Sequence, residues 1–200
     1  SLAQAESIVK DKENVSRILD SVMGSSRPRA LENAQFTFKL GNVSLACLTH
    51  FTRHRMHSIQ IPDLNTCNRN TYIVPPALKD NAELFERYES CFRKTAELYE
   101  ELKASGIDNN LLIYCLLSGN TIDIISTMNA RELLLFFRLR TCTRAQWEIQ
   151  IHANKMLDLL KEISPDLFSK YGPSCYVAKR CPEGKFSCGR FNEMMEKYSK

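Results

Sequence analysis

Hydrophobic and polar residues alternate along the chain in patterns that predict mostly helix. The clearest pattern covers residues 84–102, where apolar or weakly polar side chains recur at alternating steps of four and three, with charged residues between them: Leu84, Tyr88, Cys91, Thr95, Leu98 and Leu102. This spacing predicts an amphipathic helix that ends near Gly106. Helix is also predicted for residues 3–23, up to the break at Gly24-Ser-Ser-Arg-Pro.

A second long helical region is predicted for residues 130–163, with an interruption near residues 140–143. Residues 43–52 are apolar enough for a buried helix that leads into a cluster of basic residues. Strand-like alternation occurs in residues 35–40, whereas residues 59–76 hold three prolines and are predicted to form a loop. Because helix dominates over strand, we predict an α+β fold with a small sheet and several long helices.

Composition favours one compact domain over residues 1–200, since 44% of the residues are hydrophobic. No apolar run reaches the length of about eighteen residues that suggests a membrane span. The given residues show no leading signal peptide, but they begin at Ser1 instead of Met, which leaves open a removed upstream piece. We expect a cytoplasmic protein without a membrane partner. The net charge of +4 is too small to indicate nucleic-acid binding.

Basic residues occur in short groups, of which Arg53-His54-Arg55 is the most informative. Arginine presents a planar fork of donors that matches phosphate, and a neighbouring imidazole can donate a hydrogen bond or stack. A dinucleotide pyrophosphate or a nucleotide phosphate is therefore the expected ligand. Taken alone, three such residues would more often form a surface cluster of ion pairs.

Three blocks of sequence resemble the flavin-dependent thymidylate synthases. That family carries Arg-His-Arg, seven residues and then Ser, and the triplet stands here at residues 53–55. Residues 129–134 (Asn-Ala-Arg-Glu-Leu-Leu), 139–140 (Leu-Arg) and 144–149 (Arg-Ala-Gln-Trp-Glu-Ile) are similar to a second family segment. Glu32 with Phe-Thr-Phe at residues 36–38 fits a third, in which Asn33 replaces a histidine.

The resemblance implies a homotetramer with FAD bound where subunits meet. It implies transfer of a one-carbon unit from methylenetetrahydrofolate to deoxyuridylate, with NADPH reducing the flavin. By position, the FAD contacts would be Arg53, His54, Arg55, Asn129 and Arg131. Arg140 matches the arginine that faces the pyrimidine, where a permanent cation stabilises negative charge on the ring. The alternative for Arg131 and Arg140 is an ion pair with Glu132 or Glu148.

The substrate side departs from the family pattern. After the seven residues that follow Arg55 stands Asp63 instead of Ser, and Asn65 replaces an arginine. Ile61 replaces an acid, and His50 stands at the position of a glutamine that contacts the nucleotide. A carboxylate where a hydroxyl should meet a phosphate repels that phosphate. We therefore expect a nucleotide-like ligand other than deoxyuridylate, unless Arg69 or another basic residue compensates.

Three functions stay open from these residues. The first is an FAD-dependent, thymidylate synthase-like enzyme with an altered pocket, which transfers a one-carbon unit or a hydride to another nucleotide-like substrate. The second is a true thymidylate synthase with a rearranged substrate loop. The third is a flavin-binding or nucleotide-binding protein without catalysis.

Seven of the eight cysteines fall into two groups. Cys47, Cys91 and Cys115 lie in apolar or amphipathic runs and are expected to be small core residues. Cys175, Cys181 and Cys188 lie in a tail, residues 172–190, beside Gly and Pro residues that suit metal-binding turns. With Cys142 as the best candidate for a fourth ligand, they would form a four-cysteine structural zinc site. The alternative is free thiols or a disulfide in a mobile terminus.

Overall fold

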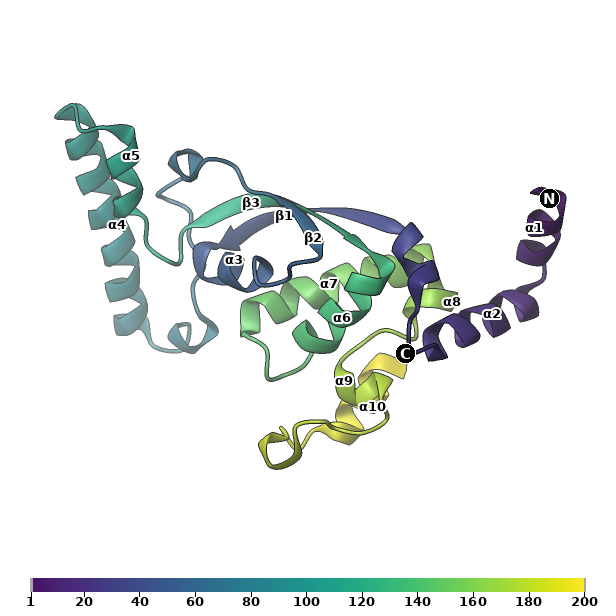
Figure 1. Ribbon diagram of the computed structural model, residues 1–200. Helices are drawn as coiled ribbons and strands as arrows, with labels where there is room; N and C mark the ends of the chain where they lie inside the picture. Colours follow the sequence, from purple (N-terminus) through teal and green to yellow (C-terminus); the bar gives the residue numbers. More distant parts are fainter. Residues whose placement is uncertain (1, 200) are drawn as a thin grey trace. The chain divides into compact units, whose positions relative to one another are not determined.

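The structure, a computed structural model, describes residues 2–199 and combines helices with a small sheet (Figure 1). The strands are β1 (Gln35–Ser44), β2 (His57–Gln60) and β3 (Thr121–Asn129), in the order β1-β3-β2. The helices are α1 (Leu2–Lys10), α2 (Lys12–Gly24), α3 (Leu45–Phe51), α4 (Ala82–Ala104), α5 (Asn109–Leu112), α6 (Ala130–Arg140), α7 (Trp147–Ile163), α8 (Pro165–Phe168), α9 (Ser174–Val177) and α10 (Phe191–Ser199). This arrangement confirms the α+β class predicted from the sequence.

The chain divides into two compact units. One unit combines Ser1–Thr37 with Thr127–Lys200, and the other consists of Phe38–Ser126. Strands β1 and β3 each contribute residues to both units, because the boundaries fall inside them. The extent of a single domain over residues 1–200 stays a prediction.

Strand β1 pairs with β3 in the antiparallel direction. The Oγ1 atoms of Thr37 and Thr127 lie 2.8 Å apart, and the backbone N–H of Asn42 donates to Asp123 Oδ1 at 3.0 Å. Residue numbers therefore rise along one strand as they fall along the other. The predicted strand at residues 35–40 is confirmed and continues to Ser44. Strands β2 and β3 lie outside the segments predicted as strand, and β2 occupies the start of the predicted loop.

The core of the first unit lies between α6, α7 and α8. Helix α6 buries Phe136 and Phe137 completely, and α7 buries Ile149 on the facing side. Tyr171, also fully buried, donates its hydroxyl to the Ala130 carbonyl at 3.0 Å. The predicted helical region with an interruption is confirmed, since α6 ends at Arg140 and α7 begins at Trp147.

The helix predicted for residues 3–23 is in fact two helices. Asp11 lies between α1 and α2 in an extended conformation, and its side chain accepts hydrogen bonds from the backbone N–H groups of Glu13 and Asn14. An aspartate in this role begins a new helix because it satisfies N–H groups that have no carbonyl partner. The capping residue was therefore present in the sequence inside an otherwise helical pattern.

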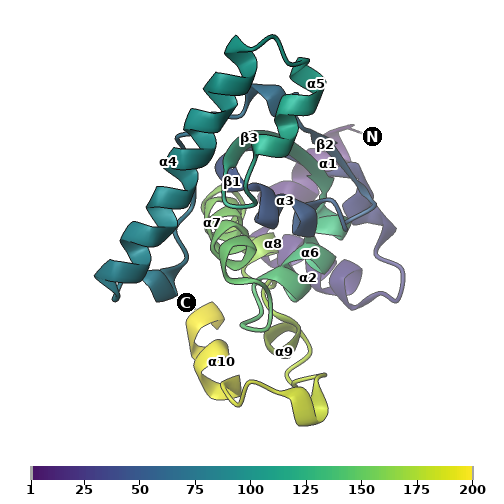
Figure 2. The same cartoon turned by 90° about the vertical axis from the view of Figure 1, so that its left-hand side faces the viewer.

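In the second unit, the long helix α4 has α5 beside its C-terminal end (Figure 2). Helix α4 buries Phe92, whose ring stacks on Tyr72 with ring centroids 4.2 Å apart. The predicted helix is confirmed, but only part of its apolar repeat is covered: Tyr88, Thr95 and Leu102 are half-buried, whereas Leu84 and Leu98 are 43% and 46% exposed. Cys91 is exposed as well, which corrects its expected place in the core, whereas Cys47 and Cys115 are buried as expected.

Among residues 2–199, no helix has both the length and the hydrophobicity needed to cross a bilayer.

Candidate functional site

Helix α3 leads directly into the Arg53-His54-Arg55 segment. The helix begins at Ser44, whose hydroxyl accepts a hydrogen bond from Cys47 N–H at 2.9 Å, and it ends at the fully buried Phe51. The backbone N–H of His54 donates to the Phe51 carbonyl at 3.1 Å. This turn leaves the His54 side chain 7% exposed, while Arg53 and Arg55 on either side are exposed.

Neither Arg53 nor Arg55 makes a hydrogen bond or ion pair with another residue in the described range 2–199. Two guanidinium groups, separated in sequence only by His54, thus have no carboxylate among the described residues to neutralise them. Guanidinium stays cationic at any working pH and donates to phosphate in a bidentate manner. The segment therefore fits the diphosphate of a dinucleotide, while its contact with FAD stays a prediction.

Two more histidines flank this segment. His50 lies in the last turn of α3 and is half-buried. His57 begins β2, and its ring lies 6.4 Å from that of His54 at an interplanar angle of 25°. The structure therefore places His50, predicted on the substrate side, one helical turn before Arg53.

Asp63 and Asn65 are hydrogen-bonded to each other within a turn. Asp63 is the N-cap of a 3₁₀ turn, Leu64–Thr66, and its Oδ1 accepts from the backbone N–H of Asn65 at 2.9 Å and from the Asn65 amide nitrogen at 3.1 Å. Aspartate and serine are both good capping residues. An aspartate at this position is therefore consistent with the local turn, although its charge differs from that of serine.

Arg69 holds the end of the same loop. It is 7% exposed, and its Nη1 donates to the carbonyls of Asn65 at 2.8 Å and Cys67 at 2.6 Å. The guanidinium carbon lies 4.0 Å from the centre of the Tyr99 ring. The Nε and Nη2 atoms of Arg69 are buried and have no hydrogen-bond partner among the described residues. Arg69 lines a cavity of about 430 Å³ together with Arg93 and Lys103.

At the start of α6, Asn129 and Arg131 already have partners inside the chain. The Asn129 side-chain oxygen accepts from Glu132 N–H at 2.9 Å and so caps the helix. Arg131 forms an ion pair with Glu32, and both side chains are about half exposed. The sequence offered Glu132 or Glu148 as the alternative partner of Arg131, but the partner is Glu32, which lies on a 3₁₀ turn, Arg29–Asn33.

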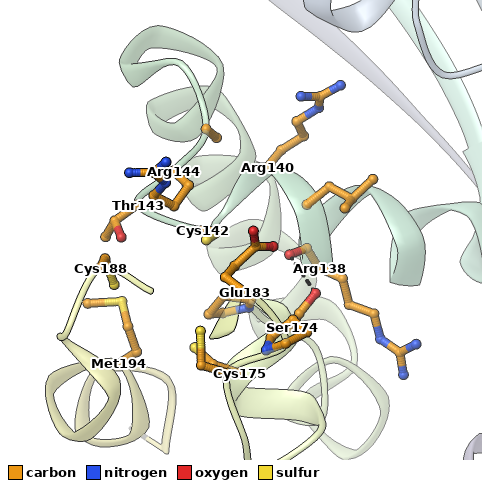
Figure 3. Close-up of a pocket in the computed structure, with 15 residues that line it drawn as sticks. Arg138, Arg140, Cys142, Thr143, Arg144, Ser174, Cys175, Glu183, Cys188 and Met194 are labelled. Atoms are coloured by element: carbon orange, nitrogen blue, oxygen red, sulfur yellow. Dashed lines mark hydrogen bonds between the residues drawn. The ribbon is translucent and has the colours of Figure 1, made fainter. Parts of the chain in front are cut away.

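Arg140 is the last residue of α6 and is half-buried. Thr141, which follows it, is fully buried and donates its hydroxyl to the Phe137 carbonyl at 2.6 Å. Figure 3 shows the guanidinium groups of Arg138 and Arg140 directed away from Cys142 and Cys175. Arg140 therefore extends from a helix end that is fixed by buried neighbours.

The cysteines predicted as metal ligands line one cavity of about 170 Å³ in the first unit: Cys142, Cys175, Cys181 and Cys188. Burial, followed by the neighbouring Cys142 and Cys181 thiols, raises the pKa of Cys175. The nearby Thr143 side chain, followed by the Arg190 backbone, lowers the pKa of Cys188. Cysteines separated in sequence are thus neighbours in space, and all are free thiols in the structure.

Comparison with known proteins bears on this geometry. Residues 1–166 match the family model described as thymidylate synthase complementing protein. The flavin-dependent thymidylate synthase of Clostridium tetani is 35% identical over 96% of this chain and 85% of its own length. The same-named proteins of Geobacter sulfurreducens (35% identical, 90% of this chain, 79% of that protein) and Pyrococcus abyssi (33%, 95%, 82%) are also similar. The chain belongs to the flavin-dependent thymidylate synthase family.

Membership of the flavin-dependent thymidylate synthase family confirms the resemblance carried by the three sequence blocks. Two residues that the sequence did not single out for their contacts are Glu32, as the partner of Arg131, and Tyr99, as the ring beneath Arg69. Neither contact leaves a pattern in the local sequence, because the partners are far apart along the chain. Glu32 and Arg131, for example, are separated by 99 residues. The functional roles of the predicted site residues stay predictions.

Proposed function

We propose that the chain is an FAD-dependent, thymidylate synthase-like enzyme acting on a nucleotide-like substrate other than deoxyuridylate. The observation that carries the cofactor is the pair of exposed arginines, Arg53 and Arg55, without partners among the described residues. An unneutralised pair of cations in a protein of this family supports the binding of an anionic dinucleotide. When bound, the flavin supplies the hydride of the reaction.

The chain's own residues would bind and orient the cofactor and the substrate. Arg53 and Arg55 would hold the diphosphate, and the buried His54 would fix the turn that presents them. Asn129 would keep its side-chain oxygen on the α6 N-terminus and offer only its amide N–H groups to the cofactor. Arg131 would exchange all or part of its ion pair with Glu32 for contact with the cofactor. Arg140 would stabilise negative charge on the substrate ring.

The substrate proposal rests on the Asp63–Asn65 turn. A dianionic phosphate at this turn would meet the Asp63 carboxylate, and the Asn65 amide is already directed to that carboxylate. Asp63 is exposed, so water screens the repulsion between its carboxylate and a phosphate, which costs about 1 kcal/mol by order of magnitude. A nucleotide-like molecule without a phosphate at this point avoids that cost. Methylenetetrahydrofolate and NADPH are the proposed co-substrates, and a homotetramer is the proposed assembly.

A true thymidylate synthase with a rearranged loop is the second candidate, and Arg69 favours it. Its Nε and Nη2 groups lack partners among the described residues, and the cavity that it lines also contains Arg93 and Lys103. A phosphate shifted into this cavity would meet these three basic residues, although the carboxylates of Glu97 and Glu100 line the cavity too. A flavin-binding protein without catalysis is the remaining alternative.

The test begins with the flavin content of the purified full-length chain, measured by absorbance after denaturation. The flavin is then reduced with NADPH without oxygen, and methylenetetrahydrofolate is added with deoxyuridylate or with other pyrimidine nucleotides and nucleosides. Reoxidation with a methylated product from another substrate supports our proposal. Turnover of deoxyuridylate supports the second candidate, and flavin without any turnover supports the third. A chain that binds no added FAD overturns the cofactor assignment.

A further inference from the structure

The strongest unexplained feature of the first unit is the cysteine-lined cavity shown in Figure 3. Cys142 comes from the loop between α6 and α7, Cys175 from α9, and the other two from the segment between α9 and α10. None of these thiols has a part in the proposed reaction. Four cysteines brought to one cavity from three separate segments differ from a single buried cysteine such as Cys115, which packs as a small apolar side chain.

The segment between α9 and α10 has little apolar surface to hold it in place. Residues 178–180, 182–187, 189 and 190 are exposed, and Phe186 is 57% exposed. Lys179 and Gly189 have positive φ angles of 52° and 74°, which form tight turns near the cysteines. A small segment without a hydrophobic core usually needs a cross-link or a metal to keep one conformation.

The neighbouring helices nevertheless hold this segment beside Cys142. The Tyr198 hydroxyl of α10 is 2.7 Å from Asn154 Oδ1 and 3.2 Å from the Thr141 carbonyl, to either of which it can donate. The Ser174 hydroxyl of α9 donates to the Arg138 carbonyl at 3.2 Å. These contacts hold α9 and α10, which flank the segment, near the loop that carries Cys142, so the four thiols share one cavity without a disulfide.

We propose that Cys142, Cys175, Cys181 and Cys188 bind one structural zinc ion as four thiolates. A closed set of four cysteine ligands is a common structural zinc site, and soft thiolates select zinc over harder cations. On binding, four S–H bonds break, four Zn–S bonds form and four protons pass to solvent, with no change in oxidation state. The proposal is independent of the flavin and of the substrate.

The cavity must contract when it takes up the ion. No three of the four sulfur atoms, all in described residues, lie within 4.8 Å of one another. Zn–S bonds of about 2.3 Å place tetrahedral ligands about 3.8 Å apart. Zinc would therefore draw the exposed segment toward Cys142 and tighten the loop that directly follows Arg140. The ion would hold that loop in place without touching the reacting atoms.

The first experiment measures zinc in the full-length chain, grown with added zinc and purified in the presence of reductant and without chelator. Elemental analysis should find about one zinc per chain in the unaltered protein and in the control variant Cys91→Ser, which changes an exposed thiol on α4. Cys181→Ser and Cys188→Ser should lower metal affinity at least about ten-fold, since even outer-shell changes have that effect. No zinc in the unaltered protein, or equal zinc in all variants, overturns the proposal.

A second measurement keeps the test valid if a variant fails to fold. The unaltered protein, stripped of metal, is titrated with Co²⁺, which should give thiolate-to-cobalt charge-transfer bands and intense tetrahedral d–d bands at one equivalent. Spectra typical of octahedral cobalt would contradict a four-thiolate site. Thiols are also counted in protein denatured without reductant after removal of metal: eight support the proposal, and six or four show disulfides at the expense of the zinc site.

Discussion

Residues 53–55 and residues 63–65 follow one another in the same unit, yet their polar side chains are in opposite situations. Arg53 and Arg55 are exposed and have no partner among the described residues. Asp63 and Asn65 are bound to each other, and the Asn65 carbonyl is bound to Arg69. The first segment has donors available for a ligand, whereas the second uses its donors to maintain a turn.

The difference indicates how a family site can change on one side only. Unpaired guanidinium groups such as those of Arg53 and Arg55 attract a phosphate whichever ligand carries it. A self-satisfied turn, in contrast, offers a carboxylate that repels phosphate and few donors that replace water. We therefore expect substitutions in the two segments to act on different ligands.

The largest expected effect is that of Arg53→Ala on FAD. A hydrogen bond to a charged group contributes about 1.5–3 kcal/mol, so the substitution should weaken FAD binding about ten- to hundred-fold. Titration of the flavin-free protein, followed by flavin fluorescence, measures the change. Arg87→Ala, which removes an exposed arginine of α4, should leave the affinity unaltered. Equal affinities in both variants would show that Arg53 does not contact the cofactor.

A smaller effect is expected from Asp63→Asn on deoxyuridylate. Asparagine keeps the capping oxygen and removes the charge, so binding of deoxyuridylate should rise about ten-fold, which is about 1.4 kcal/mol. Calorimetric titration measures it, and Asp80→Asn changes an exposed aspartate of the same unit as a control. FAD affinity should stay constant in both variants. If Asp63→Asn changes FAD binding and leaves deoxyuridylate binding as it was, the contrast between the segments fails.

Arg131→Ala should affect FAD less than Arg53→Ala does. Arg131 must give up its ion pair with Glu32 before it contacts a ligand, and such a half-exposed pair contributes at most about 1 kcal/mol to stability. The double variant Arg131→Ala with Glu32→Gln, compared with each single variant by urea denaturation and FAD titration, separates the two roles. A loss of FAD affinity larger than that of Arg53→Ala would place the main cofactor contact on α6.

The smallest expected effect is a change of folding stability with pH, and it comes from His152, which lies outside both segments. Burial lowers the pKa of His152 from its ordinary 6.5, with Glu148 opposing the shift. The unfolded chain then binds a proton before the folded chain does, so stability is complete above pH 6.5 and falls as the pH drops through the lowered value. Urea denaturation at neutral and mildly acid pH should show a smaller loss in His152→Gln. An identical loss in both proteins would assign the pH dependence to other groups.

Helices were the part of the fold most accessible from the sequence. The break between α6 and α7 was predicted near residues 140–143, and the structure has it between Arg140 and Trp147. The length of α4 was predicted closely, but its buried side was not, since Phe92 is buried instead of Cys91. A repeat of apolar positions predicts a helix, whereas the packing partners decide which of two adjacent rows is covered.

Strands were harder to predict because pairing supplies their stability. In β3, Ile122, Ile124, Ser126 and Met128 are buried in alternation, but the serine and threonines of this segment weaken the apolar pattern. The strand lies at the centre of the sheet because β1 and β2 both pair with it. That arrangement depends on segments more than sixty residues away, which include β2, His57–Gln60.

The sequence by itself determined the features that act over a few residues: the length of α4, the break between α6 and α7, and the triplet of residues 53–55 with its family blocks. Tertiary structure alone decided that Arg131 pairs with Glu32 and that Arg53 and Arg55 lack partners among the described residues. It also gathered four cysteines around one cavity. Periodicity involves neighbours within about one helical turn, so it is visible in sequence. Ion pairs and cavities join distant segments, and packing decides which of them meet.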